Sequence, residues 1–450
     1  MSGKVAQAEV TAEIHSVPFG EAMRVWARVA LLSFGGPAGQ IAVMHRIVVD
    51  EQKWIGEGRF LQALNFCTLL PGPEATQLAI YIGWLMHRVP GGLMAGTLFV
   101  LPGMLAIMAL SWIYVLLGKV TAVQGLFFGL KAAVLVIVIE AVLRIGRRAL
   151  RTNALRGLAV WAFVAIFFYR MPFPAIVLVA ALVGWALRRV PATTAVAETP
   201  TVLGEETPEH ARPDRRRVLG LGALFVLLWW GPVVALLLLL GPGSVFTDIG
   251  YFFSKMAVVT FGGAYAVLAY VAQEAVGHYH WLSGAEMVDG LGLAETTPGP
   301  LIMVTQFVGF LAAWRAPGSL PPLLAATLGG LLTTWVTFVP CFLWIFAGAP
   351  FVESLRANKA LASALAGVTA AIVGVILNLA VWFGLRVLFA DLHPVHFWGA
   401  EFDAPVLASA NVTAIVLTAA AALAIFRLHL GMLPVLAGCS LIGLLYALVL

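Results

Sequence analysis

Charged side chains are scarce in this chain. Asp, Glu, Lys and Arg make up 11% of its 450 residues, and 61% of the residues are hydrophobic. Soluble domains carry about 25% charged residues. Apolar runs of membrane-spanning length, ~20 residues, recur from end to end, and the alternating segments of ~10 residues typical of a membrane barrel are missing. The composition predicts an all-α polytopic membrane protein.

Cysteine and enzyme motifs are also scarce. Cys67, Cys341 and Cys439 lie far apart in apolar surroundings, so they indicate neither a disulfide framework nor a zinc site. We find no Walker motif, zinc-protease motif or nucleophile constellation. We therefore expect a protein that is not an enzyme and that needs no metal or cofactor. The net charge of +5 reflects membrane topology, and we expect no nucleic-acid partner.

Two motifs rich in glycine and proline occur twice, separated by the same number of residues. Phe34-Gly35-Gly36 recurs as Phe261-Gly262-Gly263, and Pro71-Gly72-Pro73 recurs as Pro298-Gly299-Pro300, both at an offset of 227 (261 − 34 = 298 − 71 = 227). Trp54 and Trp281 share that offset. A duplicated membrane domain is typical of secondary transporters, whose substrate site lies at the repeat interface. The chain therefore divides as follows: a cytoplasmic N-terminal segment at 1–20, a first repeat at 21–188, a cytoplasmic linker at 189–216, a connecting helix at 217–240 and a second repeat at 248–450.

Basic residues set the expected orientation. Arginines gather near residue 150 and in the linker, which places both in the cytoplasm. Six spans in each repeat plus the unpaired stretch 217–240 give thirteen spans, two repeats of opposite topology and an exterior C-terminus. This count takes 57–70 and 284–296 as re-entrant; both remain open as spanning segments. Residues 1–20 do not resemble a cleaved signal peptide.

Proline and glycine inside apolar stretches predict broken helices. Proline removes a backbone donor, and broken backbone at membrane depth is tolerated only inside protein or beside a water-filled cavity. We expect helices to start at 74 and 301 and to aim their N-terminal N–H groups at an anion. The alternative is that the glycines only allow close helix packing.

Basic and polar residues near these breaks extend the expected oxyanion site. Arg28 and Lys255 are equivalent by the repeat offset, and we expect both to face the protein interior; the alternative is that Arg28 reaches an interface. Hydroxyl and amide groups suit oxyanion oxygens as donors. The predicted substrate-binding residues are Arg28, Ser33, Gly35, Gly36, Pro71, Gly72, Pro73, Gln77, Lys131, Lys255, Thr260, Gly262, Gly263, Thr297, Pro298, Gly299 and Pro300.

Three acidic residues are candidate proton carriers: Glu74, Glu140 and Glu295. Glu74 or Glu295 would repel an anion unless protonated, and helix capping is an equally common role for both. Lys131 and Glu140 lie two and a half turns apart on one helix, too far to pair directly. We expect each to pair with other helices, either in substrate gating or as a structural ion pair.

These motifs together resemble the chromate ion transporter family in its long, two-domain form. The residues that carry the resemblance are Ser33-Phe34-Gly35-Gly36-Pro37, Gln40-Ile41-Ala42, Trp54, Leu70-Pro71-Gly72-Pro73, Gln77-Leu78-Ala79 and Gly83 in the first half, and Thr260-Phe261-Gly262-Gly263, Trp281 and Thr297-Pro298-Gly299-Pro300 in the second. Ala264 and Val267 stand where the first half has Pro37 and Gln40, which predicts a less polar second half-site.

The resemblance implies efflux of chromate, a divalent oxyanion, across the inner (plasma) membrane, driven by the membrane potential or a proton gradient and conferring chromate resistance. It also implies halves of opposite orientation. A sulfate or other oxyanion carrier and an anion channel are the alternatives. The expected partners are the chromate or sulfate anion and the lipid bilayer, and the sequence permits a homodimer.

Overall fold

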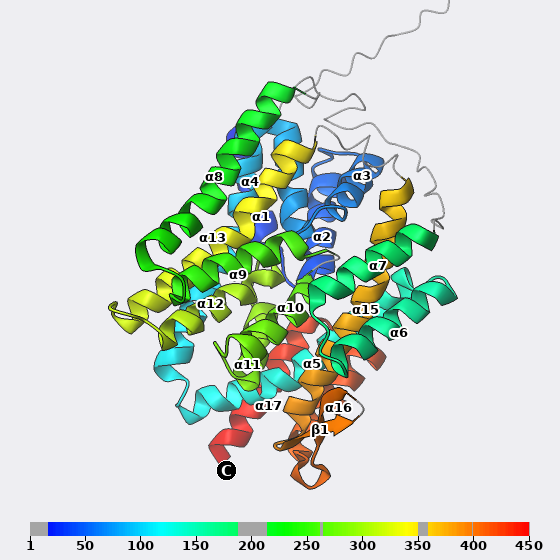
Figure 1. Ribbon diagram of the computed structural model, residues 1–450, viewed down its shortest axis with the longest axis vertical. Coiled ribbons are helices and arrows are strands. Elements are labelled where there is room, and N and C mark those ends of the chain that lie inside the picture. The colour runs from blue at the N-terminus through cyan, green and yellow to red at the C-terminus, as the bar shows by residue number, and fades with distance from the viewer. Residues whose placement is uncertain (1–16, 188–213, 262–263, 350–358, 398, 450) are drawn as a thin grey trace, which may run out of the picture.

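The computed structural model describes residues 17–187, 214–261, 264–349, 359–397 and 399–449 (Figure 1). Most of the predicted N-terminal segment and linker lies outside these residues. Six helices are long and apolar enough to cross a membrane: α4 (Glu74–Leu117), α5 (Thr121–Ala149), α8 (Arg215–Leu240), α13 (Pro322–Gly348), α15 (Lys359–Leu388) and α17 (Met432–Val449). The chain is a helical membrane protein, as its composition predicts.

The two halves contain the same helices in the same order. The first half comprises α1 (Phe19–Leu32), α2 (Gly36–His45) with the π-helix η1 (Arg46–Glu51), α3 (Glu57–Cys67), α4, α5, α6 (Asn153–Phe167) and α7 (Phe173–Leu187). The second comprises α9 (Val245–Val259), α10 (Ala264–Ala272) with η3 (Gln273–His278), α11 (Gly284–Thr296), η4 (Leu301–Met303) with α12 (Val304–Arg315), α13, α15, α16 (Val412–Ala422) with η7 (Leu423–Arg427), and α17. Because α4 is non-helical at His87 and Arg88, its two parts correspond to α12 and α13.

The first break turns the chain back on itself. Gly35 and Gly36 have φ of 82° and 68°, values that an L side chain rarely adopts. The Arg28 guanidinium on α1 lies 2.7 Å from the Glu51 carboxylate at the end of η1, so α2 and η1 run back along α1. The expected single broken span at 21–49 is therefore wrong, and α1–α2 is a helical hairpin.

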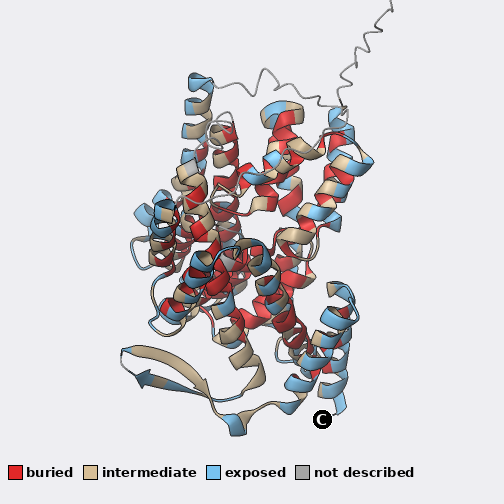
Figure 2. Cartoon of the chain, turned by 90° about the vertical axis from the view of Figure 1, so that its right-hand side faces the viewer, coloured by how far each residue is buried: buried red, intermediate tan, exposed pale blue. Residues whose placement is uncertain are grey.

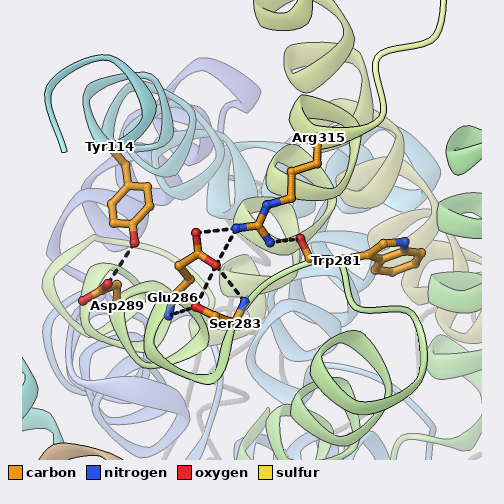
Figure 3. A network of polar contacts seen from close by, with 6 residues as sticks. All are labelled: Tyr114, Trp281, Ser283, Glu286, Asp289 and Arg315. Atoms are coloured by element: carbon orange, nitrogen blue, oxygen red, sulfur yellow. Dashed lines mark hydrogen bonds and ion pairs between the residues drawn. The ribbon is translucent and has the colours of Figure 1, made fainter. Parts of the chain in front are cut away.

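The Pro-Gly-Pro turns are the tips of a second pair of hairpins. Arg315, the last residue of α12, binds the Glu286 carboxylate at the start of α11 at 2.6 Å and donates to the Trp281 carbonyl at 2.5 Å (Figure 3). The outer ends of α11 and α12 therefore lie together. The ring of His87 likewise hydrogen-bonds the Val17 carbonyl at 2.7 Å, which returns the first part of α4 to the start of α1.

Helices of the two repeats pack directly against each other. α5 packs along α17, and α15 packs along α7. Glycines permit both contacts: a Cβ on Gly443 would lie 2.4 Å from the Gly125 carbonyl, and one on Gly367 would lie 2.7 Å from the Gly184 Cα. Small residues allow this close approach of membrane helices. The two repeats are interleaved, with α1–α3 above α9–α11 in Figure 1.

Two elements lie outside the repeat pattern. α8 falls where the unpaired stretch 217–240 predicts a helix, and most of its surface is exposed apolar side chain, for example Leu238 and Leu239, which suits contact with lipid. The antiparallel strands β1 (Leu392–Phe397) and β2 (Ala400–Pro405) form a hairpin in the region expected to be an exterior loop. It extends along the lower edge of the molecule in Figure 2, away from the buried residues at the centre.

Candidate functional site

The hairpin tips of the two repeats are joined by a symmetric pair of backbone hydrogen bonds. The Gly72 N–H donates to the Thr260 carbonyl, and the Gly299 N–H donates to the Ser33 carbonyl, both at 2.9 Å. Gly72 and Gly299 are equivalent in the repeat, and so are Ser33 and Thr260. Each Pro-Gly-Pro turn is thus held by the helix break of the opposite repeat. We call this meeting point the tip crossing.

Helix N-termini converge at the tip crossing. α4 begins at Glu74 after Pro73, with no side-chain cap, and η4 begins at Leu301 after Pro300, as the prolines predict. The first N–H groups of each helix have no intrahelical acceptor. A Cβ on Gly36, at the start of α2, would lie 3.2 Å from the Tyr265 hydroxyl of α10.

Two glutamines bind the Pro-Gly-Pro turns through their amide groups. Gln40 of α2 donates to the Gly299 carbonyl at 2.6 Å, across the repeats, and Gln77 of α4 donates to the Pro71 carbonyl at 2.7 Å. The Gln77 Oε1 and the Thr76 hydroxyl are buried without a hydrogen-bond partner in the described part of the chain. These two polar groups on the first turn of α4 remain free to bind a ligand or water.

The hydroxyls expected to bind an oxyanion are otherwise engaged. The Ser33 hydroxyl donates to the Val29 carbonyl at 2.6 Å, and the Thr260 hydroxyl donates to the Met256 carbonyl at 2.5 Å. Thr297 donates to the Ala294 carbonyl at 3.3 Å. Each hydroxyl has one proton to donate, so none of these three O–H groups is free to bind a ligand. Gly262 and Gly263 lie outside the described residues.

The basic pair Arg28 and Lys255 does not face the interior. Arg28 is half exposed and bound to Glu51, and Lys255 is exposed on α9. The expectation that both point inward is wrong because each lies on the outer face of its helix, whereas the neighbouring Val29 and Met256 are buried.

Lys131 makes an ion pair between the repeats. Its ammonium lies 2.9 Å from the Asp289 carboxylate of α11, which also accepts a hydrogen bond from the Tyr114 hydroxyl at 2.9 Å (Figure 3). The side chain of Asp289 is 8% exposed. The sequence predicted a partner for Lys131 without identifying it; the signal was the lone aspartate inside the short apolar segment at 284–296.

The glutamates lie in different settings. Glu140 pairs with Arg144 on its own helix at 3.6 Å, so the expected partner on another helix is wrong. Glu295 is buried at the end of α11, and one of its oxygens accepts a hydrogen bond from Tyr265 at 2.9 Å. Its second oxygen has no partner among the described residues. Glu295 therefore lies beside the tip crossing, since Tyr265 contacts Gly36.

A tyrosine and an arginine of this region are absent from the predicted site. Tyr265 stands two residues after the second Gly-Gly, and Arg144 interacts electrostatically with both Tyr265 and Glu295. From the sequence, Arg144 predicted only membrane orientation, because Arg147 and Arg148 follow it in the same basic cluster. No group of His, Cys, Asp and Glu suited to a metal occurs among the described residues.

These features define a class of protein: a membrane transport protein of two interleaved repeats, with broken helices that meet at mid-molecule. The chain belongs to the chromate transporter family, whose model matches residues 20–185 and 247–444. It is 32% identical over 354 residues to the chromate transport protein of Pseudomonas aeruginosa, covering 78% of this chain and 77% of that protein.

Other relatives cover the chain to a similar extent. The chromate transport protein of Cupriavidus metallidurans is 28% identical over 367 residues, covering 81% of this chain and 82% of that protein. A probable chromate transport protein of Synechococcus elongatus is 28% identical over 372 residues, covering 80% and 83% respectively. No solved structure matches the chain.

Proposed function

We propose that this protein exports chromate across the inner (plasma) membrane and thereby confers chromate resistance, with the oxyanion bound at the tip crossing. The observation that carries the proposal is the reciprocal pair of hydrogen bonds that brings uncapped helix N-termini of both repeats together. Such N-termini favour anions, and the family of the chain supports chromate as the substrate.

Helix dipoles alone do not offset the dehydration of a dianion. Each terminus contributes about 0.3–2 kcal/mol, whereas removing one ion from water costs several kcal/mol. A cation must supply the rest. Lys131 is neutralised by Asp289, and Arg28 and Lys255 are exposed. Arg144 pairs more loosely, at 3.6 Å with Glu140 on its own helix, and it acts electrostatically on Tyr265 and Glu295. It is the cation that we assign to the site.

The membrane potential suits export as the driving force. One charge crossing the potential is worth about 2.3 kcal/mol per 100 mV, so an outward-moving dianion gains about 4.6 kcal/mol. Glu295 carries the proton-linked part of the mechanism, because its free oxygen beside the tip crossing repels a dianion when the carboxyl is ionised. Protonation of Glu295 therefore favours anion binding.

The hairpins change the topology that we propose. If α1–α2 and α3 with the first part of α4 enter and leave on one side, each repeat crosses the membrane four times. With α8 the chain then has nine spans rather than thirteen. The arginine-rich ends of α5 and α8 remain cytoplasmic, and the two repeats keep opposite orientations.

Flux of radiolabelled chromate and sulfate into everted vesicles tests the proposal. We expect chromate accumulation that follows an imposed potential, positive inside the vesicle, and that disappears in the Arg144→Gln variant. Arg147→Gln, which removes a charge from the end of the same helix, is the control. Sulfate flux without chromate flux would make the protein a sulfate carrier, and conductance independent of protons would make it a channel.

A further inference from the structure

A cavity of about 400 Å³ lies at the opposite end of the molecule from the arginine-rich end of α8. The α6–α7 connection, η3, the end of α15 and strand β2 surround it. Its charged lining residues are Arg170, Glu274, Arg386, Glu401 and Asp403, with His278 beside them. A water occupies ~30 Å³ of liquid, so the cavity has room for a hydrated oxyanion. None of these residues belongs to the tip crossing.

The β1–β2 hairpin holds both arginines of the cavity. The Glu401 carboxylate lies 3.1 Å from Arg170, and the Asp403 carboxylate lies 2.9 Å from Arg386. Glu401 and Asp403 are two residues apart on β2, so both project from the same face of the strand. Arg386 is further fixed by Trp382, with its guanidinium 4.1 Å from the ring centroid.

Helix α10 connects the cavity with the tip crossing. Ala269 of α10 lines it, and Ala269 is one helical turn from Tyr265, so the two share a face of α10. Tyr265 contacts Gly36 and binds Glu295. The cavity and the tip crossing therefore lie about one helical turn apart along α10.

We propose that Arg170 and Arg386 form an exit site for the transported divalent oxyanion, and that Glu401 and Asp403 of the hairpin displace the anion from it. The inference rests on the proposed function for the identity of the ligand. A guanidinium binds carboxylates and tetrahedral oxyanions through the same paired N–H groups. The two carboxylates are thus tethered competitors of the substrate.

The tether gives the competition its direction. Groups on a short tether act at an effective concentration in the millimolar range, so the hairpin outcompetes a dilute anion that returns from outside. With the hairpin in place, three carboxylates and two guanidinium groups face the cavity, which repels anions. The hairpin then closes the exit behind the released substrate.

Sulfate protection of a cysteine in the cavity tests the proposal. Gly277 lines the cavity, is exposed and has no atom within 4 Å of an added Cβ, and the three native cysteines are buried. We would label Gly277→Cys from outside with an impermeant maleimide in right-side-out vesicles containing sodium sulfate or sodium gluconate. Sulfate replaces chromate because chromate oxidises thiols.

We expect Glu401→Gln with Asp403→Asn to lower the half-protecting sulfate concentration at least tenfold. Arg170→Gln with Arg386→Gln should abolish protection, and Arg386→Lys should retain part of it. Asp391→Asn is the control. Asp391 lies on the same loop as the hairpin and makes no ion pair among the described residues, so this variant should leave protection unchanged. Unaltered protection in the Glu401/Asp403 variant, or full protection in the arginine variant, overturns the exit site.

The assay separates the two proposals because it reads binding rather than flux. If the unmodified chain carries neither chromate nor sulfate in everted vesicles, the proposed function fails whatever the labelling shows. If the chain transports chromate but sulfate never protects Gly277→Cys in any variant, only the exit site fails. Elution of each variant as a single peak in detergent shows that the variant is folded.

Discussion

Gly72 and Gly299 show why single residues matter at the tip crossing. Their φ values are 116° and 89°, and their N–H groups are the donors that join the repeats. A Cβ on Gly72 would lie 3.0 Å from the Gln77 Nε2, and one on Gly299 would lie 3.1 Å from the Gly103 Cα. Both positions require glycine for backbone conformation and for space.

Replacing Gly72 or Gly299 by Val should lower chromate flux at least tenfold while the protein still reaches the membrane. The added side chain shifts the Pro-Gly-Pro turn and separates the helix N-termini. Flux per amount of immunodetected protein in everted vesicles measures the effect. Gly318→Ala is the matched control, since Gly318 also has a positive φ but no neighbour within 4 Å. Normal flux in both Val variants would make the motifs packing devices.

Glu295→Gln should retain transport but flatten its pH dependence. The amide keeps the shape of a protonated carboxyl, so the variant resembles the anion-accepting form at every pH. In the unmodified protein, sulfate flux should fall as pH rises, because the ionised carboxylate repels the dianion. Tyr265→Phe, which removes the hydrogen bond but not the carboxyl, should keep the pH dependence. An unchanged profile in Glu295→Gln, with a flat one in Glu74→Gln, would move the proton site to Glu74.

At the scale of elements, a buried ion pair outside the tips joins α5 to α11 across the repeats. Lys131 and Asp289 meet at 2.9 Å, and Tyr114 of α4 completes the group. Removing one partner of a buried ion pair destabilises the fold by about 3–5 kcal/mol, because the other charge stays buried and unpaired. Replacing both partners by uncharged residues changes stability little. The contact therefore stabilises the fold through charge balance.

Asp289→Asn should lower the melting temperature in detergent by several degrees, because Lys131 remains as an unpaired charge. Lys131→Met should also lower it, and the double variant should recover most of the loss. A thermal-shift assay on purified protein measures all three. Glu140→Gln, which breaks the ion pair within α5, is the control and should have a smaller effect. Additive losses in the double variant would show that the two residues are not coupled.

At the scale of the whole molecule, the hairpins decide on which side each loop lies. The chain turns back after α1, since Glu51 at the end of η1 contacts Arg28 of α1. The first part of α4 returns to the start of α1, since His87 hydrogen-bonds the Val17 carbonyl. In the second repeat, the contacts of Arg315 likewise bring the outer ends of α11 and α12 together. The tips of the two sets of hairpins meet at the tip crossing.

The cysteine of Lys53→Cys should therefore react with a maleimide applied to the cytoplasmic side. A continuous span at 21–49 would place residue 53 outside, so the same variant separates nine spans from thirteen. An impermeant maleimide applied to everted and to right-side-out vesicles measures the side, and the buried native cysteines keep the background low. Reporter fusions after Leu150 and at Leu450 should read cytoplasmic and exterior. Labelling of Lys53→Cys only in right-side-out vesicles would contradict the hairpin topology.

Sequence patterns alone predict the helical membrane class, the duplication and the starts of the helices at Glu74 and Leu301. These are local consequences of apolar length, of a motif repeated in register and of proline, which has no N–H to donate. The extra apolar stretch at 217–240 likewise predicted α8. Family membership followed from the same motifs.

Tertiary structure alone decided which groups meet. Gly35-Gly36 predicts a break but not its angle, so only the fold shows that the chain turns back and leaves Arg28 on the surface beside Glu51. The partners of Lys131 and Tyr265 lie far along the chain, at Asp289 and Glu295, and no local periodicity encodes such contacts. The hydroxyls of Ser33 and Thr260 were assigned to a ligand by type, yet helix geometry places a carbonyl within reach of each. Polar composition indicates what a site can bind, and only the packing of the two repeats decides which polar groups remain free.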